Sequence, residues 1–385
     1  MSRIQYLTQI ELGAGALRLL AEECRKAGMT RPLVVSDPGV RAAGLLDRAL
    51  AALGDLPHAV WAETPGNPNE SAVRAAAAAY KEAACDGLVA LGGGSSIDLA
   101  KGVAIVATHA GPLTHYATIE GGADRITAAA APLIAVPTTA GTGSEVARGA
   151  ILIVDDGRKL GFHNWHLMPR LALLDPELTL GLPPMLTAAT GMDAIAHCLE
   201  TFMAPAFNPP ADGIALDGLQ RGWAHLERAC RAGATEVDAR LQMMSASMQG
   251  ALAFQKGLGC VHSLSHSLGG LDPTLHHGTL NAVFLPAVIR FNAQAESMRR
   301  DARLPRIAHA MGLPDAAGDT EGEGVAQAIR DRNALLGLPP GLEALGVHPD
   351  QFDRIIEHAM VDHCHKTAPR IATREDYRQM LEASM

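Results

Sequence analysis

Acidic and imidazole side chains recur at helical spacing in the second half of this chain. Asp193 and His197 are four residues apart, and so are His262 and His266, so each pair shares one face of a helix. A carboxylate with several imidazoles is a ligand set that suits Fe²⁺ or Zn²⁺. The alternative interpretation of such a histidine, on an otherwise apolar helix, is a packed core residue. In chain order, the candidates are Asp193, His197, His262, His266, His276 and His277.

A second chemical signal is a glycine cluster that follows an apolar run. Residues 87–91 read as a buried strand, and Gly92–Ser96 then open a helix. Glycine lets a phosphate approach the backbone, and the N–H groups at a helix N-terminus bind anions. A tight turn without a ligand would use the same residues. The loop 137–145, rich in Thr and Gly, follows the next apolar run, so two such loops predict a pyrophosphate-sized site at one sheet edge.

Asp37 ends an earlier apolar run and is placed to accept hydrogen bonds from a ribose diol. Its charge would repel a 2′-phosphate, which favours NAD over NADP. The simpler interpretation is a turn residue before Pro38.

The elements that must position these residues differ between the two halves of the chain. Up to about residue 180, helical segments such as 71–85 alternate with short β-rich runs at 32–37, 58–61, 87–91, 132–137, 150–154 and 171–175. After residue 182 the apolar positions follow helical periodicity only. The sequence predicts a Rossmann-like α/β domain with a parallel sheet over residues 1–180, followed by an all-helical metal-binding domain over residues 181–385.

Composition excludes several other classes of protein. The chain has 385 residues, of which 48% are hydrophobic, and a net charge of −9. No basic excess exists to neutralise nucleic-acid phosphates. No apolar run approaches the roughly 18 residues that a membrane helix needs, and the N-terminus lacks a signal-peptide apolar region. Six cysteines without a CxxC pair predict free thiols in a reduced, cytoplasmic protein.

Taken together and in order, the motifs resemble those of the iron-containing (group III) alcohol dehydrogenases over essentially the whole length. The motifs are Gly92–Lys101, Pro137–Glu145, Asp175–Leu178, Gly191–His197, Gly257–His262 and His277-Gly278. The resemblance implies an NAD-binding α/β domain, a helical metal domain and an active-site cleft between them. It also implies a divalent metal, Fe²⁺ or Zn²⁺, that would polarise the hydroxyl of a small alcohol.

The resemblance assigns roles to individual positions. It implies that Asp193, His197, His262 and His277 hold the metal, with His276 as the alternative fourth ligand because this stretch is one residue longer than is common in the family. His266 would relay a proton or contact the substrate, or pack behind the ligands. The residues expected to bind the cofactor are Asp37, Asn67, Gly93, Gly94, Ser95, Asp98, Thr138, Thr139, Thr142 and Lys159.

Further segments are similar to the 4-hydroxybutyrate dehydrogenase branch of the family. They are residues 158–166, 204–212, 253–257 and 362–367. A substrate with a carboxylate needs a cationic partner in its site. Arg148, His365 and Lys366 are the candidates, with His163 and His166 behind them.

Other functions remain open at this stage. A related dehydrogenase could take a plain primary alcohol or a maleylacetate-type substrate. A dehydroquinate-synthase-like lyase would use NAD and a metal on the same architecture, and a non-enzymatic binding protein could have kept the cofactor fold. Family resemblance also implies a homodimer.

Overall fold

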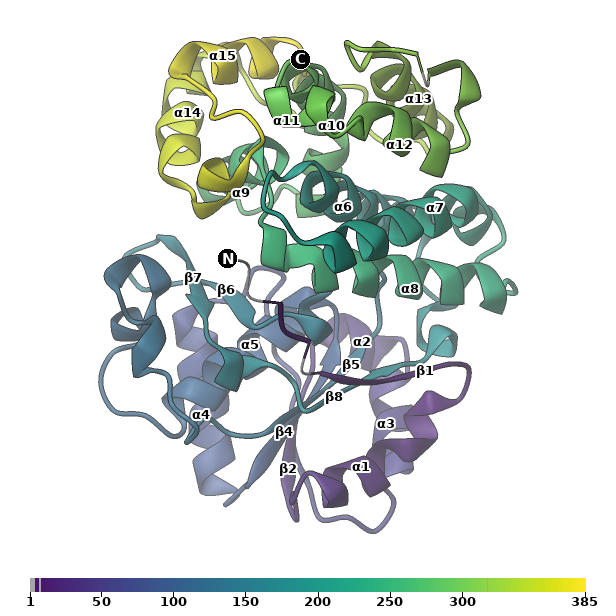
Figure 1. Cartoon of the computed structure of the whole chain (residues 1–385). Helices are drawn as coiled ribbons and strands as arrows, with labels where there is room; N and C mark the ends of the chain where they lie inside the picture. Colours follow the sequence, from purple (N-terminus) through teal and green to yellow (C-terminus); the bar gives the residue numbers. More distant parts are fainter. Residues whose placement is uncertain (1–3, 7, 317) are drawn as a thin grey trace. The chain divides into compact units, whose positions relative to one another are not determined.

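The computed structural model describes residues 4–6, 8–316 and 318–385 of the chain. These residues form two compact units: Tyr6–Gly181 is the first, and Leu182–Met385 with the residues before Tyr6 is the second. The first is an α/β unit and the second is helical (Figure 1). The predicted fold class is therefore confirmed.

The α/β unit is built on a parallel sheet that has six strands within the described residues, in the order β1-β8-β5-β4-β2-β3. Strands β2, β4, β5 and β8 are buried along their whole length, which accounts for their nearly continuous apolar sequences. The bounds are β1 (Gln9–Leu12), β2 (Pro32–Val35), β3 (Ala59–Trp61), β4 (Gly87–Gly92), β5 (Leu133–Pro137) and β8 (Leu171–Leu174).

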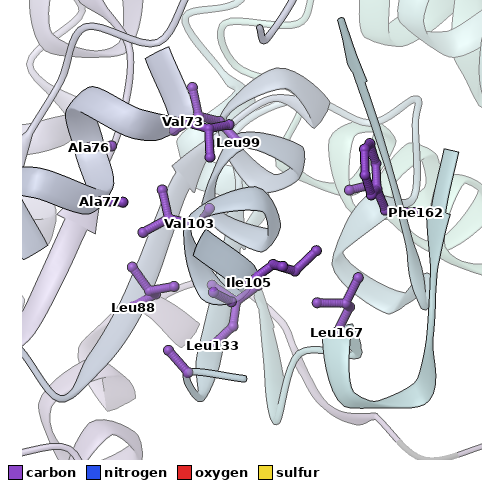
Figure 2. Packing of buried hydrophobic residues seen from close by; sticks show 14 of the residues in the cluster. Val73, Ala76, Ala77, Leu88, Leu99, Val103, Ile105, Leu133, Phe162 and Leu167 are labelled. Carbon is purple, nitrogen blue, oxygen red and sulfur yellow. The ribbon is translucent and has the colours of Figure 1, made fainter. Parts of the chain in front are cut away.

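Helices cover both faces of this sheet. One face packs on α1 (Leu20–Lys26), α2 (Pro38–Ala42) and α3 (Leu45–Leu53). The other face packs on α4 (Glu70–Glu82) and α5 (Gly94–Val106). Figure 2 shows Leu88 and Leu133 of the sheet beside Val103 of α5 in this second core. Alternate residues of β2, β4 and β5 thus fill two separate apolar layers.

Two strand assignments differ from the sequence prediction. The run 150–154 is indeed a strand, β6 (Gly149–Ile153), but it pairs antiparallel with β7 (Lys159–His163) outside the parallel sheet. Its residues alternate between buried and half-buried, as expected when one face of a hairpin packs on the core. Strand β1 was not expected, because its short sequence is mostly exposed and pairs only with β8.

The second unit contains helices and no strand in the part of the chain that is described. Three of its long helices, α6, α7 and α8, pack against one another. The bounds are α6 (Pro184–Met203), α7 (Pro209–Arg231), α8 (Val237–Leu252), α9 (Cys260–Leu271), α10 (His277–Ala293), α11 (Glu296–Arg300), α12 (Arg303–Ala310), α13 (Glu323–Leu335), α14 (Phe352–Val361) and α15 (Arg374–Glu382). Among the helices of the described residues, none combines the length and apolar character needed to span a membrane. All six cysteines are buried and unpaired, as expected.

Substitution of Leu88 tests how much the core between the sheet and helices α4 and α5 contributes to stability. Leu88 is fully buried at the centre of the sheet. We expect Leu88→Ala to lower the free energy of unfolding by about 2–5 kcal/mol, because it removes buried methyl groups and leaves a cavity. The measurement is urea denaturation. Val60 on edge strand β3 is 38% exposed, so Val60→Ala should cost below about 1 kcal/mol. Equal losses in the two variants would contradict this description of the core.

Candidate active site

Helix α6 presents a row of buried polar side chains inside the helical unit. Asp193, His197 and Glu200 lie at i, i+4 and i+7, so they share one face of the helix. All three are buried. Because buried charged groups need partners, this face requires neighbouring helices that supply them.

Glycine brings one of those helices close. A Cβ on Gly278 would lie 2.2 Å from the carbonyl oxygen of Ala189 and 3.2 Å from Cβ of Asp193. Only glycine therefore lets the start of α10 approach α6 so closely. The preceding residue, His277, is the first residue of α10 and is carried to the same face of α6. This contact gives the His-Gly pair of the sequence a physical reason.

The carboxylate of Asp193 is the common centre of the predicted metal ligands. Its Oδ1 lies 3.6 Å from Nε2 of His197, 3.8 Å from Nε2 of His262 and 3.7 Å from Nε2 of His277. Atoms bound about 2.1 Å from one tetrahedral ion lie about 3.4 Å apart. Asp193, His262 and His277 each offer a ligand atom within 4.8 Å of the other two, and the His197 ring stacks on His262 with centroids 4.6 Å apart.

An amide group stands where these ligand atoms converge. Asn281 Nδ2 lies 2.7 Å from Asp193 Oδ1, 3.2 Å from His262 Nε2 and 3.1 Å from His277 Nε2. The same position suits a positive charge, since the carboxylate oxygen and the two imidazole nitrogens around it can each supply a lone pair. Oδ1 of this fully buried amide has no hydrogen-bond partner. The donor set, its spacing and this orphaned oxygen fit a divalent metal ion.

The protonation state of the buried ligand also suits a metal. Burial, reinforced by the neighbouring His197, lowers the pKa of His262 well below its usual value. A neutral imidazole offers the lone pair that a metal needs. His276, the alternative ligand, is exposed at the N-cap of α10, whereas His277 is in the cluster.

His266 lies beside the ligand cluster and is held from its other side. Its Nδ1 is 3.1 Å from Oδ2 of Asp362, and its ring stacks on His277 with centroids 5.3 Å apart. Burial opposes ionisation of Asp362, but His266, His363 and the backbone N–H of Cys364 more than offset this and lower its pKa. The carboxylate therefore remains charged beside the imidazole.

The same carboxylate belongs to a second group of possible ligands: His266, Asp362, His363 and Cys364. Cys364 is buried, and burial raises its pKa well above the usual value, so its sulfur is a thiol and not a thiolate. Asp362 and His363 both contact His266, through a hydrogen bond and through stacked rings, and so form part of its surroundings.

In the α/β unit, the predicted cofactor residues follow neighbouring strands. Asp37 follows β2, Gly93 to Ser95 follow β4, and the loop from Thr138 to Thr142 follows β5. Strands β2, β4 and β5 are adjacent and parallel, so these segments meet at the carboxyl edge of the sheet. Open α/β sheets bind ligands at this edge.

The two small-residue loops approach each other closely. A Cβ on Gly94 would lie 2.6 Å from Cγ2 of Thr142, and one on Gly93 would lie 3.4 Å from Oγ1 of Thr139. Thr138 joins the loops through a 3.0 Å hydrogen bond from its N–H to the carbonyl of Gly92. Glycine at these positions thus lets the start of α5 lie directly against the second loop.

Asp37 has two partners within the protein. Its Oδ1 accepts the N–H of Val40 and caps α2, and its Oδ2 accepts the hydroxyl of Ser96 at 3.1 Å. The turn interpretation from the sequence therefore describes part of its role. The neighbouring Ser95 does not share the Ser96 contact, because its hydroxyl donates to the carbonyl of Gly66 at 2.6 Å.

Asp98 and Lys101 together fix the loop that follows β5. Asp98 accepts hydrogen bonds from the Ser144 hydroxyl at 2.5 Å and the Ile151 N–H at 2.9 Å. Lys101 Nζ donates to the carbonyls of Ser144, Ala147 and Gly149 at 2.7–2.8 Å. Burial lowers the pKa of Lys101 to about 8, opposed by Asp98 and Glu145. Both oxygens of Asp98 are thus committed to the protein, which indicates support of the loop.

The remaining candidates do not form one cationic cluster in either unit. Lys159 donates to Oδ1 of Asn67 at 3.3 Å, and the guanidinium of Arg148 lies 4.9 Å from the ring centroid of Trp165. In the helical unit, Nδ1 of His365 lies 3.0 Å from the hydroxyl of Tyr377. Lys366 is exposed in the same short helix, His363–Thr367. His163 contacts Thr118, and His166 is exposed.

Three residues around these sites had no role in the sequence interpretation. They are Glu200, Asn281 and Lys101. A signal existed for two of them, because Glu200 follows His197 by three residues and Asn281 follows His277 by four, so each shares a helix face with a ligand. Nothing in the spacing of Lys101 indicates that it contacts three loop carbonyls.

Comparisons with known proteins identify the family of this chain. The model of the iron-containing alcohol dehydrogenase family matches residues 8–176, and that of the C-terminal part of the family matches residues 187–385. A 4-hydroxybutyrate dehydrogenase of Cupriavidus necator is 66% identical, with both chains covered completely.

Solved structures give the same result. A 1,3-propanediol oxidoreductase is 33% identical, with a TM-score of 0.92 and full coverage of both chains. Sulfoacetaldehyde reductase from Bifidobacterium kashiwanohense, solved in complex with NAD⁺, is 25% identical, with a TM-score of 0.89 and coverage of 100% of this chain and 98% of its own. This chain belongs to the iron-containing alcohol dehydrogenase family and is an oxidoreductase that acts on the CH–OH group of a small alcohol.

Proposed function

We propose that this protein oxidises 4-hydroxybutyrate to succinate semialdehyde. A hydride passes from the alcohol carbon to NAD⁺, giving NADH, and the hydroxyl proton is released. The observation that supports this substrate is the 66% identity to the 4-hydroxybutyrate dehydrogenase over the full length of both chains.

Asp193, His197, His262 and His277 would hold the divalent ion, which we propose to be Fe²⁺ or Zn²⁺. When bound, such an ion supplies a Lewis acid that lowers the pKa of an alcohol hydroxyl. Of these side chains, His277 is 31% exposed and the others are almost completely buried. The partly exposed side of the cluster gives a small substrate access to it.

His266 is the candidate for moving the hydroxyl proton. Hydrogen bonding of its Nδ1–H to the charged Asp362 leaves the lone pair on Nε2. Nε2 can then accept the proton as hydride leaves the alcohol carbon. The stacking of His266 on His277 supports this role, since it places the imidazole next to a proposed ligand.

In the α/β unit, the strand-edge loops, which include Gly93, Gly94 and Thr138, would bind the pyrophosphate of NAD⁺. Asp37 would accept hydrogen bonds from the ribose and exclude a 2′-phosphate. Asp98 acts on this site through the loop that it holds. Asn67 and Lys159, which are also expected to bind the cofactor, are hydrogen-bonded to each other.

The carboxylate of the substrate requires a partner of opposite charge or several donors. Lys366 is the favoured candidate, because its short helix begins directly after Asp362, which holds His266. His365 is bonded to Tyr377, and Arg148 is engaged with Trp165. From the family resemblance we also infer a cytoplasmic homodimer, and the net charge of −9 supports the absence of a nucleic-acid partner.

The substrate is tested by steady-state kinetics of the metal-reconstituted protein. We expect NADH to form in a one-to-one ratio with 4-hydroxybutyrate consumed, which separates a dehydrogenase from a lyase that recycles its cofactor. We expect Lys366→Met to raise KM for 4-hydroxybutyrate about tenfold or more, and KM for 1-butanol less than about twofold, because only the acid loses a partner. Arg148→Met and His365→Ala serve as parallel variants. Equal kcat/KM for 1-butanol and 4-hydroxybutyrate in the wild-type protein would reduce the assignment to an unspecified primary alcohol.

The fourth ligand is tested by two neighbouring variants. We expect His277→Ala to abolish tight binding of one divalent ion per chain, because the imidazole next to Asp193 is removed. His276→Ala should keep most of it, since that side chain is exposed outside the cluster. The measurement is metal content after dialysis of the purified proteins. The reverse pattern would transfer the ligand role to His276.

The cofactor preference is tested with Asp37→Asn. Asparagine still caps α2, so the change removes the charge and keeps the helix start. We expect the NAD/NADP ratio of kcat/KM to fall by about tenfold or more, corresponding to about 1–3 kcal/mol of lost discrimination. An unchanged ratio would show that Asp37 serves only as the cap.

A further inference from the structure

Glu200 contacts His262 at Nδ1, whereas the other ring nitrogen of His262, Nε2, lies near Asp193. The Glu200 side chain is completely buried near the end of α6. Oε2 is 2.5 Å from Nδ1 of His262, and Oε1 accepts the N–H of Val261 at 2.8 Å. Both oxygens are therefore directed at the first turn of α9.

The contact with Nδ1 determines which nitrogen of His262 is available. An ionised carboxylate can only accept a hydrogen bond at this distance, so with Glu200 ionised the proton lies on Nδ1. The lone pair of the neutral ring then lies on Nε2, and Nε2 is the atom that faces Asp193. In the other tautomer, Nε2–H would point into the ligand cluster.

The local sequence leaves room for this contact. Gly259 is the N-cap of α9, and a Cβ there would lie 2.8 Å from Oε1 of Glu200. Any larger residue would push the carboxylate away from Val261 and His262. The φ of Gly259 is −158°, a value that any residue adopts, so the backbone conformation does not require glycine here. The requirement for glycine at this position of the Gly257–His262 motif is therefore steric.

We propose that Glu200 is a positioning residue for the metal centre, which holds His262 in the tautomer and orientation that present Nε2 to the ion. It also ties α6, which carries Asp193 and His197, to α9, which carries His262. The inference rests on the proposed ligand role of these residues and not on the identity of the alcohol. Partners of this kind typically change metal affinity by about 10–100-fold.

The test compares Glu200→Met and Glu200→Gln with Thr201→Val. Methionine fills similar space and accepts no strong hydrogen bond, whereas glutamine keeps one good acceptor for two donors. Thr201 is the next residue of α6, and its hydroxyl bonds only carbonyls of its own helix, so it reports general disturbance of α6. The dissociation constant for Co²⁺ or Zn²⁺ is measured by competition with a chelator, together with the thermal unfolding temperature.

We expect the dissociation constant to rise about 10–100-fold in Glu200→Met and about 3–10-fold in Glu200→Gln. Thr201→Val should change it less than about threefold. Metal affinity equal to wild type in a folded Glu200→Met overturns the proposal. If that variant does not fold, an unchanged affinity in Glu200→Gln overturns it instead.

A second readout follows the tautomer directly. In ¹⁵N NMR spectra of histidine-labelled protein, with His262 assigned from its absence in His262→Gln, we expect a protonated Nδ1 and an unprotonated Nε2 in the wild type. Glu200→Met should shift His262 toward a mixture of tautomers. An unaltered signal would contradict the proposal. Failure of the wild type to bind a metal at all would contradict the proposed metal site itself, whereas inactivity toward 4-hydroxybutyrate would affect only the substrate.

Discussion

The helical unit depends on one electrostatic constraint: three imidazole nitrogens lie around one buried carboxylate oxygen. Asp193 Oδ1 lies within 3.8 Å of all three nitrogens. Lone pairs that converge without a positive partner repel one another, and the low polarity of the interior strengthens the repulsion. The amide of Asn281 satisfies part of this demand. A divalent ion would remove the whole of this repulsion. The same convergence of side chains would therefore explain both how α6, α9 and α10 are packed and the proposed chemistry.

The α/β unit is organised by a steric constraint of a different kind. Its two loops at the carboxyl edge of the sheet come so close that Gly94 has no room for a Cβ beside Thr142. Such an approach is stable only if the second loop is held firmly. Lys101 and Asp98 hold it through buried hydrogen bonds to residues 144–151. The close approach of these two loops is therefore supported by a buried cation, Lys101, through its hydrogen bonds to three loop carbonyls.

Much of this arrangement could be predicted from the sequence, because it depends on local patterns. The strands β2, β4, β5 and β8 are apolar throughout, and the metal candidates fall at helical spacing. Strand β1 escaped prediction because it is only four residues long and lies at the exposed edge, so its short alternation of polar and apolar residues is a weak signal. The run 150–154 was predicted as a strand, but its partner β7 was not, because β7 is defined by its pairing with β6 across a turn. The contacts of Glu200 were not predicted, because they are made with α9, which is distant from α6 in the sequence.

The exposure of His277 has a consequence for how the protein would exchange its ion. Asp193, His197 and His262 lie deep in the helical unit, whereas His277 begins α10 and is partly exposed. Helix ends open locally at a much lower free-energy cost than the core. Opening the first turn of α10 would release one proposed ligand and leave the other three in place. Such exchange would require local opening of this turn and not unfolding of the whole unit.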